Sequence, residues 1–191
     1  KTLYFDCSSG ISGNMTLGAL LEIVGDENYL LGELKKLNVD GYKIEISKKV
    51  QNGITGTYVD VILENEHHHH DHEHEHDHGH DHEHHHHHHE HRNLYDVNTI
   101  IDNSSLDENT KDLAKRIFLR VAKAESKVHN KSLDEVHFHE VGAIDSIVDI
   151  VGTAILINKI NPDRIIASVV NDGYGFIECA HGTMAVPVPA T

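Results

Sequence analysis

The spacing of hydrophobic residues in the first third of the chain alternates between a strand period and a helix period. Apolar residues that alternate with polar ones predict strands, whereas apolar residues three and four positions apart predict helices. On these patterns we expect a buried strand at 3–5, helices over about 15–24 and 28–37, and strands at 42–50 and 57–64. Asn14 can cap the first helix, and a turn at 51–53 can join the last two strands.

The second half of the chain has longer helical patterns. We expect a short helix over 93–102, a long helix that follows a capping box at 105–108 and runs to about Val128, a helix over about 142–159, and strands at 164–170 and 176–180. The long helix carries one apolar stripe, formed by Leu113, Ile117, Val121 and Ala124. Because helices and strands are mixed without strict alternation, the sequence predicts an α/β or α+β fold and leaves its topology open.

A stretch without apolar residues separates the two halves. Seventeen of the 21 histidines lie between His67 and His91, together with seven acidic residues and no lysine or arginine. Such a segment cannot bury enough apolar surface to order itself, so it predicts a disordered insert at 66–91. We therefore expect an N-terminal segment at 1–65 and, after the insert, a helix-rich segment at 92–191 that completes the same domain.

Charge and composition exclude several classes of protein. The formal net charge of −15 is unfavourable for binding nucleic acid. No uncharged apolar stretch approaches the roughly 20 residues that cross a membrane. The absence of a signal-peptide core and the presence of only two cysteines, Cys7 and Cys179, indicate a cytoplasmic protein. The proline-rich last residues lead us to expect the N-terminal part of a longer protein.

The histidine-rich insert is the strongest chemical signal. Neutral imidazole is a good ligand for Ni²⁺, Zn²⁺ and Cu²⁺, and histidines interleaved with carboxylates form many overlapping weak sites. The insert is therefore predicted to collect and exchange a divalent metal. A low-complexity spacer and an expression tag are the alternatives, and the internal position disfavours a tag. The predicted metal ligands are His67, His68, His69, His70, His72, His74, His76, His78, His80, His82, His84, His85, His86, His87, His88, His89 and His91.

A second candidate metal site surrounds the start of the last predicted helix. His137, His139 and Glu140 precede this helix, and Asp145 and Asp149 lie four residues apart on it, so both carboxylates project from one face. Asp149 has apolar neighbours, and a buried unpaired carboxylate costs on the order of several kcal/mol. We therefore expect a cation, an arginine or a hydrogen-bond network beside Asp149. A structural N-cap with a buried ion pair is the alternative to a functional site.

Two loops carry weaker signals. The loop after the first strand can bind an anion through N–H groups at a helix N-terminus, although a tight connection that needs glycine explains it equally well. Its candidate residues are Ser9, Gly10, Ser12, Gly13 and Asn14. Near the end of the chain, Cys179 and His181 can ligate a metal or transfer a proton, but either cysteine can also be a small buried hydrophobic residue.

Four motifs, in this order along the chain, resemble the LarC family of nickel-insertion proteins. They are YFDC-x-SGISG-x-M at 4–15, the histidine-rich insert, VHFHEVGA-x-DS at 136–146, and CAHG at 179–182 with a proline-rich end. The resemblance implies a nickel chelatase, a lyase that inserts Ni(II) into pyridinium-3,5-bisthiocarboxylic acid mononucleotide to form the nickel-pincer cofactor of lactate racemase-type enzymes. It also implies CTP with Mn(II) or Mg(II), bound by a C-terminal region that this chain lacks.

On this resemblance, the site of metal or substrate comprises Asp6 and the cluster His137, His139, Glu140, Asp145 and Asp149, with His181 and Asp149 as catalytic residues. The loop from Ser9 to Asn14 is the expected seat of the cofactor's phosphate. Asn14 stands where the family usually has aspartate, so the first loop carries one negative charge fewer. Ala185 replaces a proline of the family near the end of the chain.

Partners implied by the resemblance are a separate C-terminal half and the recipient racemase, and the sequence leaves a homo-oligomer open. Two rival functions remain from the residues alone. One is a non-enzymatic nickel metallochaperone or storage protein, which needs only the insert. The other is a metal-dependent hydrolase that uses the carboxylate–histidine cluster.

Overall fold

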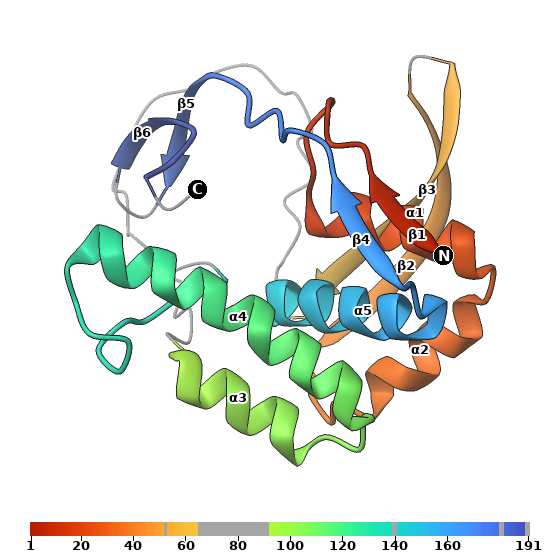
Figure 1. Cartoon of the computed structure of the whole chain (residues 1–191), viewed down its shortest axis with the longest axis horizontal. Helices are drawn as coiled ribbons and strands as arrows, with labels where there is room; N and C mark the ends of the chain where they lie inside the picture. Colours follow the sequence, from red (N-terminus) through yellow and green to blue (C-terminus); the bar gives the residue numbers. More distant parts are fainter. Residues whose placement is uncertain (52, 65–91, 139–140, 180–181, 190–191) are drawn as a thin grey trace, which may run out of the picture.

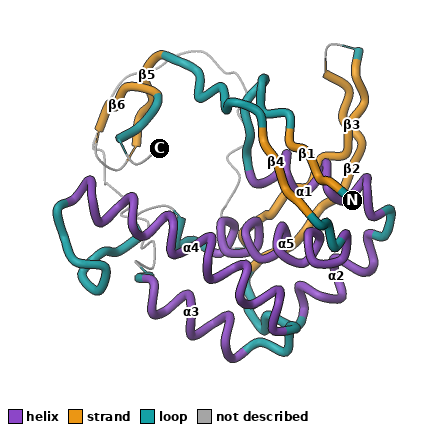
Figure 2. The backbone as a smooth tube through the Cα atoms, in the orientation of Figure 1, coloured by secondary structure: helices purple, strands orange, loops and turns teal. Residues whose placement is uncertain are grey.

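A computed structural model describes residues 1–51, 53–64, 92–138, 141–179 and 182–189. The predicted disordered insert at 66–91 lies outside the described residues. The helices are α1 (Gly13–Val24), α2 (Glu27–Lys35), α3 (Leu94–Asn103), α4 (Glu108–His129) and α5 (Ile144–Ile160). The strands are β1 (Thr2–Phe5), β2 (Tyr42–Gln51), β3 (Ile54–Leu63), β4 (Arg164–Ala167), β5 (Gly175–Cys179) and β6 (Gly182–Val186). The predicted mixture of helices and strands is confirmed (Figures 1 and 2).

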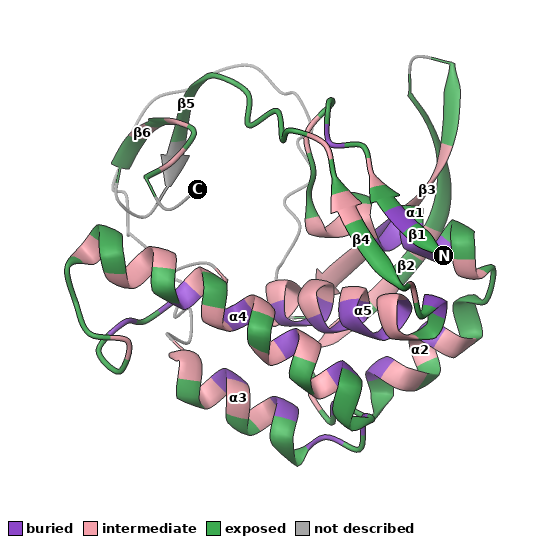
Figure 3. Ribbon diagram, in the orientation of Figure 1, coloured by how far each residue is buried: buried purple, intermediate pink, exposed green. Residues whose placement is uncertain are grey.

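Helix α5 is the centre of the hydrophobic core. Helices α1, α2 and α4 pack against it, and strand β3 contacts it as well (Figure 1). Its apolar residues are buried along most of its length (Figure 3). The fully buried large side chains around it include Leu17, Leu20, Leu30, Leu34, Phe118, Ile147 and Ile155. A polar side chain of α5 that faces this core is therefore held by close-packed neighbours.

The described strands form three two-stranded sheets. Strands β2 and β3 are an antiparallel hairpin, and β5 and β6 form a second hairpin near the end of the chain. Strand β1 pairs in parallel with β4, with Leu3 opposite Ile165 and Phe5 opposite Ala167. Because parallel strands end at the same edge of a sheet, the loop after β1 meets the segment after β4. There, the Cys7 N–H donates a hydrogen bond to Ser168 Oγ at 2.8 Å.

A glycine lets α1 lie directly on the hairpin. A Cβ atom on Gly18 would lie 2.2 Å from the carbonyl oxygen of Thr57 in β3. Any side chain at this position would push the helix away from the strand. The close backbone contact fixes the middle of α1 against β3.

Two predicted helix caps were wrong. Ser12, not Asn14, caps α1, because Ser12 has an extended backbone and its hydroxyl accepts a hydrogen bond from the Met15 N–H. Asn14 lies within the helix, and its side-chain amide donates a hydrogen bond to Asp60. Asp107 alone caps α4, accepting hydrogen bonds from the N–H groups of Asn109 and Thr110. In each case the cap lies two residues from the predicted one, Ser12 instead of Asn14 and Asp107 instead of Ser105.

Two other patterns differ from expectation. The fully buried face of α4 is formed by Thr110, Ala114, Phe118 and Ala122, one residue round from the predicted stripe. Phe118 sets this rotation, since its ring packs against Phe138 with the ring centroids 6.0 Å apart. Strand β4 ends at Ala167 rather than at 170, and β6 was not predicted. Val169 is 89% exposed, so its β-branched side chain was misleading as a strand signal.

Candidate functional site

The first two turns of α5 hold the candidate carboxylates. Asp145 lies in the first turn, where its Oδ1 accepts a hydrogen bond from the Ser146 N–H at 2.8 Å. Asp149 lies one turn later on the same face, and the two carboxylates act on each other electrostatically. The predicted pairing at i and i+4 is therefore present in the folded chain.

Asp149 has a half-buried carboxylate with one unpaired oxygen. Its Oδ1 is shielded from solvent and has no hydrogen-bond partner among the described residues. The pKa of Asp149 is raised from 3.8 to about 6. Burial is the largest cause, and the nearby carboxylates of Asp145 and Asp60 add to it. No arginine or other described side chain donates a hydrogen bond to Oδ1, and the expected cation stays a prediction. Asp149 is thus suited to receive a positive charge or a proton from elsewhere.

Asp60 is a member of this cluster that the sequence analysis missed. It lies in β3, and its Oδ1 accepts a hydrogen bond from Asn14 Nδ2 in α1 at 3.4 Å. The available signal was an acidic residue inside the apolar run 59–63. Only the packing of α1 on the hairpin brings this residue to α5. We name Asp60, Asp145 and Asp149 the acidic cluster.

The N-terminal turn of α1 lies directly against the acidic cluster. A Cβ atom on Gly13 would lie 2.0 Å from Asp149 Oδ2 and 2.4 Å from its Cγ. Glycine is therefore required for the Asp149 carboxylate to lie here. The positive end of the α1 dipole also points at this carboxylate, which partly offsets its burial. Two separate sequence signals, the loop at 6–14 and the carboxylates of α5, meet at one place.

A cavity of about 370 Å³ opens beside Asp149. Its described walls come from β1 and the loop that follows it, α1, α4, α5, β4 and the segment after β4. Asp149 is the one charged side chain among these lining residues. The walls are otherwise mostly apolar, and include Phe5, Cys7, Ile11, Ile117, Ile150 and Ile157. The Cys7 thiol is buried and not in a disulfide.

The loop residues proposed to bind phosphate have definite local roles. Gly10 has a φ of +88°, and its N–H donates to the Cys7 carbonyl at 3.1 Å. Ser9 is exposed, and Ser12 is engaged as the cap of α1. The exposed Asp6 accepts a hydrogen bond from the Ser8 N–H at 3.1 Å, and its contacts with Ser8 lower the pKa of its carboxyl group. Phosphate binding by this loop stays a prediction.

Of the histidines predicted as metal ligands, His137 alone falls within the described residues. His137 is exposed and forms an isolated bridge with Asn93. His139, Glu140 and His181 lie outside the described residues, as do all the histidines from His67 to His91. Among the residues that the structure describes, no group of three His, Cys, Asp or Glu side chains is arranged to hold a metal ion.

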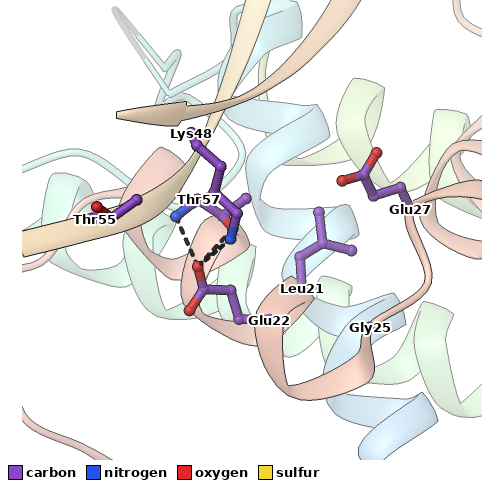
Figure 4. Close-up of a pocket in the computed structure, with 7 residues that line it drawn as sticks. All are labelled: Leu21, Glu22, Gly25, Glu27, Lys48, Thr55 and Thr57. Carbon is purple, nitrogen blue, oxygen red and sulfur yellow. Dashed lines mark hydrogen bonds and ion pairs between the residues drawn. The ribbon is translucent and has the colours of Figure 1, made fainter. Parts of the chain in front are cut away.

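A second cavity, of about 520 Å³, lies at the C-terminal end of α1 (Figure 4). Glu22 Oε1 accepts hydrogen bonds there from Lys48 Nζ at 2.8 Å, the Thr57 N–H at 2.9 Å and Thr57 Oγ1 at 2.7 Å. Lys48 and Thr57 together lower the pKa of Glu22 to about 2. A carboxylate with a pKa this low is a poor proton acceptor at neutral pH. We therefore interpret the hydrogen bonds of Glu22 Oε1 as a clamp between α1 and the hairpin.

None of the described helices is long and apolar enough to cross a membrane. The family model described as "Nickel insertion protein" matches residues 3–191. No solved structure gives a significant match.

Three relatives carry the name pyridinium-3,5-bisthiocarboxylic acid mononucleotide nickel insertion protein. The protein from Acetivibrio thermocellus is 53% identical over 190 residues, which cover 100% of this chain and 44% of the relative. Those from Clostridium kluyveri and Clostridium acetobutylicum are 50% and 51% identical, over 100% of this chain and 46% and 48% of their own lengths. The chain thus spans about half the length of these relatives. The family match over nearly every residue and the identity with these relatives show that the chain belongs to the nickel insertion protein family.

Proposed function

We propose that this chain takes up Ni(II) and takes part in its insertion into pyridinium-3,5-bisthiocarboxylic acid mononucleotide, as the N-terminal part of a nickel chelatase. The observation that carries the proposal is the family match over 3–191 together with relatives named for this substrate. The structure supports it with the half-buried Asp149, whose Oδ1 is shielded from solvent and has no hydrogen-bond partner among the described residues. The product is the nickel-pincer cofactor of lactate racemase-type enzymes.

Insertion into the ring requires a base. When a nickel–carbon bond forms, the electron pair of the ring C–H bond becomes the bond to Ni(II), and the proton must leave to an acceptor. We assign this role to Asp149, because its Oδ1 has no hydrogen-bond partner among the described residues and burial raises its pKa to about 6. A base with a pKa near the working pH transfers protons most effectively. His181 is the second candidate base, from sequence alone.

Nickel reaches this site as a substrate. The seventeen histidines of the insert supply borderline nitrogen ligands that exchange Ni(II) readily, and soft sulfur donors of the organic substrate then retain it. Asp6, His137, His139, Glu140 and Asp145 are the proposed ligands that guide the ion during transfer. The loop from Ser9 to Asn14 is the proposed contact for the substrate phosphate.

The remaining requirements are assigned outside this chain. CTP with Mn(II) or Mg(II) binds the part of the longer relatives that this chain does not match. We propose that a C-terminal half completes the reaction and that the recipient racemase then takes the cofactor, in the cytoplasm. A homo-oligomer is compatible with this scheme.

The test is an insertion reaction followed by mass spectrometry of the small-molecule product. The chain is supplied with Ni(II), the bisthiocarboxylate substrate and CTP with Mn(II), alone and with the C-terminal half of a relative. Nickel-containing product is expected only in the complete mixture that holds both halves. Absence of product in that mixture, with both halves folded, would contradict the proposal.

A nickel metallochaperone is the second candidate function, and the histidine-rich insert is the feature that favours it. Storage or delivery needs the insert alone, so deletion of 67–91 would abolish such a function. For an insertion protein, the same deletion lowers nickel capacity but leaves insertion measurable at abundant Ni(II). The two functions therefore separate in one deletion variant.

A further inference from the structure

The hairpin of β5 and β6 lies outside the hydrophobic core. The two strands pair with each other, and no other described helix or strand packs extensively on them. None of the described residues at 161–177 and 182–189 is buried (Figure 3). A two-stranded hairpin on its own is marginally stable in water. The hairpin and the segment that leads to it therefore lack an apolar partner within the described part of the chain.

Large apolar side chains are exposed along this segment and the first strand of the hairpin. Tyr174 is 96% exposed and Phe176 is 77% exposed. We name the docking strip the five exposed apolar residues of this stretch, Val169, Val170, Tyr174, Phe176 and Ile177. Val170 also lines the apolar cavity beside α5, so the strip adjoins that cavity. Exposed apolar residues that are grouped in this way are typical of a surface that another protein covers.

The parallel sheet that precedes the strip is incompletely covered as well. Parallel sheets usually have both faces covered. Tyr4 lies opposite Ile166 on one face of the sheet of β1 and β4. Leu3 lies opposite Ile165 on the other face. Because Tyr4 and Ile165 are both exposed, each face leaves a large apolar side chain in water. Strand β4 leads directly into the docking strip, so the two uncovered regions are neighbours along the chain.

The rest of this chain cannot supply the cover. The residues outside the description are 52, 65–91, 139–140, 180–181 and 190–191, and their only apolar side chains are two alanines. A second copy is disfavoured by charge. The stretch 165–189 contains two acidic residues and no lysine or arginine, so two copies that met there would bring like charges together. A different polypeptide, with apolar and basic residues, fits this surface better.

We propose that the docking strip binds the part of the longer nickel insertion proteins that this chain does not match. The inference rests on the proposed function, which requires a C-terminal half. The relatives have the length for it, since the chain covers 44–48% of their residues. Within one polypeptide the two halves meet at an effective concentration on the order of millimolar, so a modest apolar contact is sufficient. Apolar residues of that half cover Tyr174 and Phe176, and its lysine or arginine residues face the acidic stretch.

Hydrogen exchange followed by mass spectrometry tests the docking strip. The chain alone is compared with a fused chain, in which it replaces the matched part of a relative and is followed by the unmatched part. Amide groups at 169–177 are expected to exchange at least about tenfold more slowly in the fused chain, because the docked half excludes water from this segment. Exchange within α5 is expected to be the same in both proteins and reports that the body is folded.

Two substitutions in the strip and one matched control separate docking from folding. Tyr174→Ser and Phe176→Thr remove exposed apolar surface, and threonine retains a preference for strands. Each is expected to remove most of the protection in the fused chain and to leave exchange in the chain alone unchanged. Tyr95→Ser removes an aromatic ring that is 77% exposed, as Phe176 is, but lies on α3. This control is expected to leave the protection intact.

Equal exchange at 169–177 in the two proteins would overturn the proposal, as would full protection in both strip variants. Protection that grows with the concentration of the chain alone would also overturn it, because the strip would then bind a second copy. Nickel insertion by the fused chain without protection of the strip would overturn only this inference. Protection of the strip without insertion, when the fused chain is supplied with Ni(II), the organic substrate and CTP with Mn(II), would overturn only the proposed function.

Discussion

At the scale of single residues, Asp149 combines a cost for folding with the proposed role as a base. Burial and two neighbouring carboxylates raise its pKa to about 6, so ionising it in the folded chain is unfavourable. Proteins keep such a group when its charge is needed for binding or catalysis. Gly13 contributes by leaving space for the carboxylate at the N-terminus of α1.

The cost predicts that Asp149→Asn stabilises the chain at neutral pH. The folded pKa of about 6 lies above the ordinary value of 3.8, so the folded state holds the proton more tightly than the unfolded state between these values. The penalty in the native protein is therefore complete above about pH 6 and disappears as the pH falls through 4. We expect a gain of about 1–2 kcal/mol at pH 7 after allowance for solvent screening.

Thermal unfolding of both proteins between pH 4 and pH 8 measures this effect. A gain of this size corresponds to an increase in melting temperature of roughly 2–8 °C for a domain of this length. The difference between the two proteins should grow from pH 4 to pH 7. A melting temperature for Asp149→Asn that is lower than that of the native chain at pH 7 would contradict the assigned environment of the carboxylate.

The residue-scale predictions from sequence succeeded where they were local. Asp145 and Asp149 share a face because a helix repeats every 3.6 residues, which requires no knowledge of the rest of the fold. Asp60 was missed because its place depends on how α1 packs on β3. The role of Asn14 was wrong for a similar reason: it bonds to Asp60, and Ser12 provides the cap.

At the scale of elements, α1 joins the site to the rest of the fold. Its first turn contacts Asp149 of α5, its middle lies on the backbone of β3, and its last turn is clamped to the hairpin through Glu22. Helix α1 thus fixes the distance between the loop after β1 and the acidic cluster. A substitution in its first turn is expected to displace the Asp149 carboxylate, and one in its last turn is expected to weaken the contact with the hairpin.

Gly13→Ala is expected to displace the Asp149 carboxylate. The added Cβ would lie 2.0 Å from Oδ2, so either the helix or the side chain must move. We expect a loss of about 1–3 kcal/mol in stability, as for other overpacked sites. Gly32→Ala in α2 is the matched control, because no atom lies within 4 Å of its Cβ position, and it should be neutral or stabilising. Equal behaviour of the two variants in urea unfolding would refute the contact.

The clamp at the other end of α1 predicts a dependence on acid. The pKa of Glu22 is held near 2 by Lys48 and Thr57, below the ordinary value of 4.5. Its contribution to stability is therefore present above about pH 4.5 and is lost as the pH falls through 2. Glu22→Gln should lower the melting temperature at pH 6 and have little effect near pH 2. An equal effect at both values would show that the ion pair is not what holds the hairpin.

The boundaries of the helices could largely be predicted, whereas the pairing of the strands could not. The apolar period locates α1, α4 and α5 within a few residues, since each helix buries one face on the same core. The parallel pairing of β1 with β4 joins segments about 160 residues apart, for which the local pattern holds no information. That pairing is also what brings Cys7 and Ala167 to the lining of one cavity.

At the scale of the whole molecule, the chain combines an ordered body with a histidine-rich segment of different composition. The body contains the acidic cluster and the apolar cavity, and the segment contains seventeen of the 21 histidines. The described part offers no group of three side chains arranged for a metal ion. We therefore propose that the segment collects nickel and that the body transfers it.

Deletion of 67–91 tests this division. Isothermal titration at pH 7.5 should show that most of the nickel-binding capacity is lost. In the full chain, capacity should fall as the pH is lowered from about 7.5 to about 5.5, because protons compete for imidazoles with pKa values near 6.5. Unchanged nickel stoichiometry in the deletion variant, or a flat pH profile in the full chain, would show that nickel is collected elsewhere.

The most direct test of the central claim is the rate of nickel insertion with Asp149→Asn. The reaction is run with the C-terminal half of a relative, CTP and saturating Ni(II), so that nickel supply does not limit the rate. If Asp149 accepts the ring proton, the variant should lose at least about a hundredfold in rate, the usual contribution of a general base, while Glu22→Gln stays near the native rate. A native rate for Asp149→Asn in a folded protein would contradict the account.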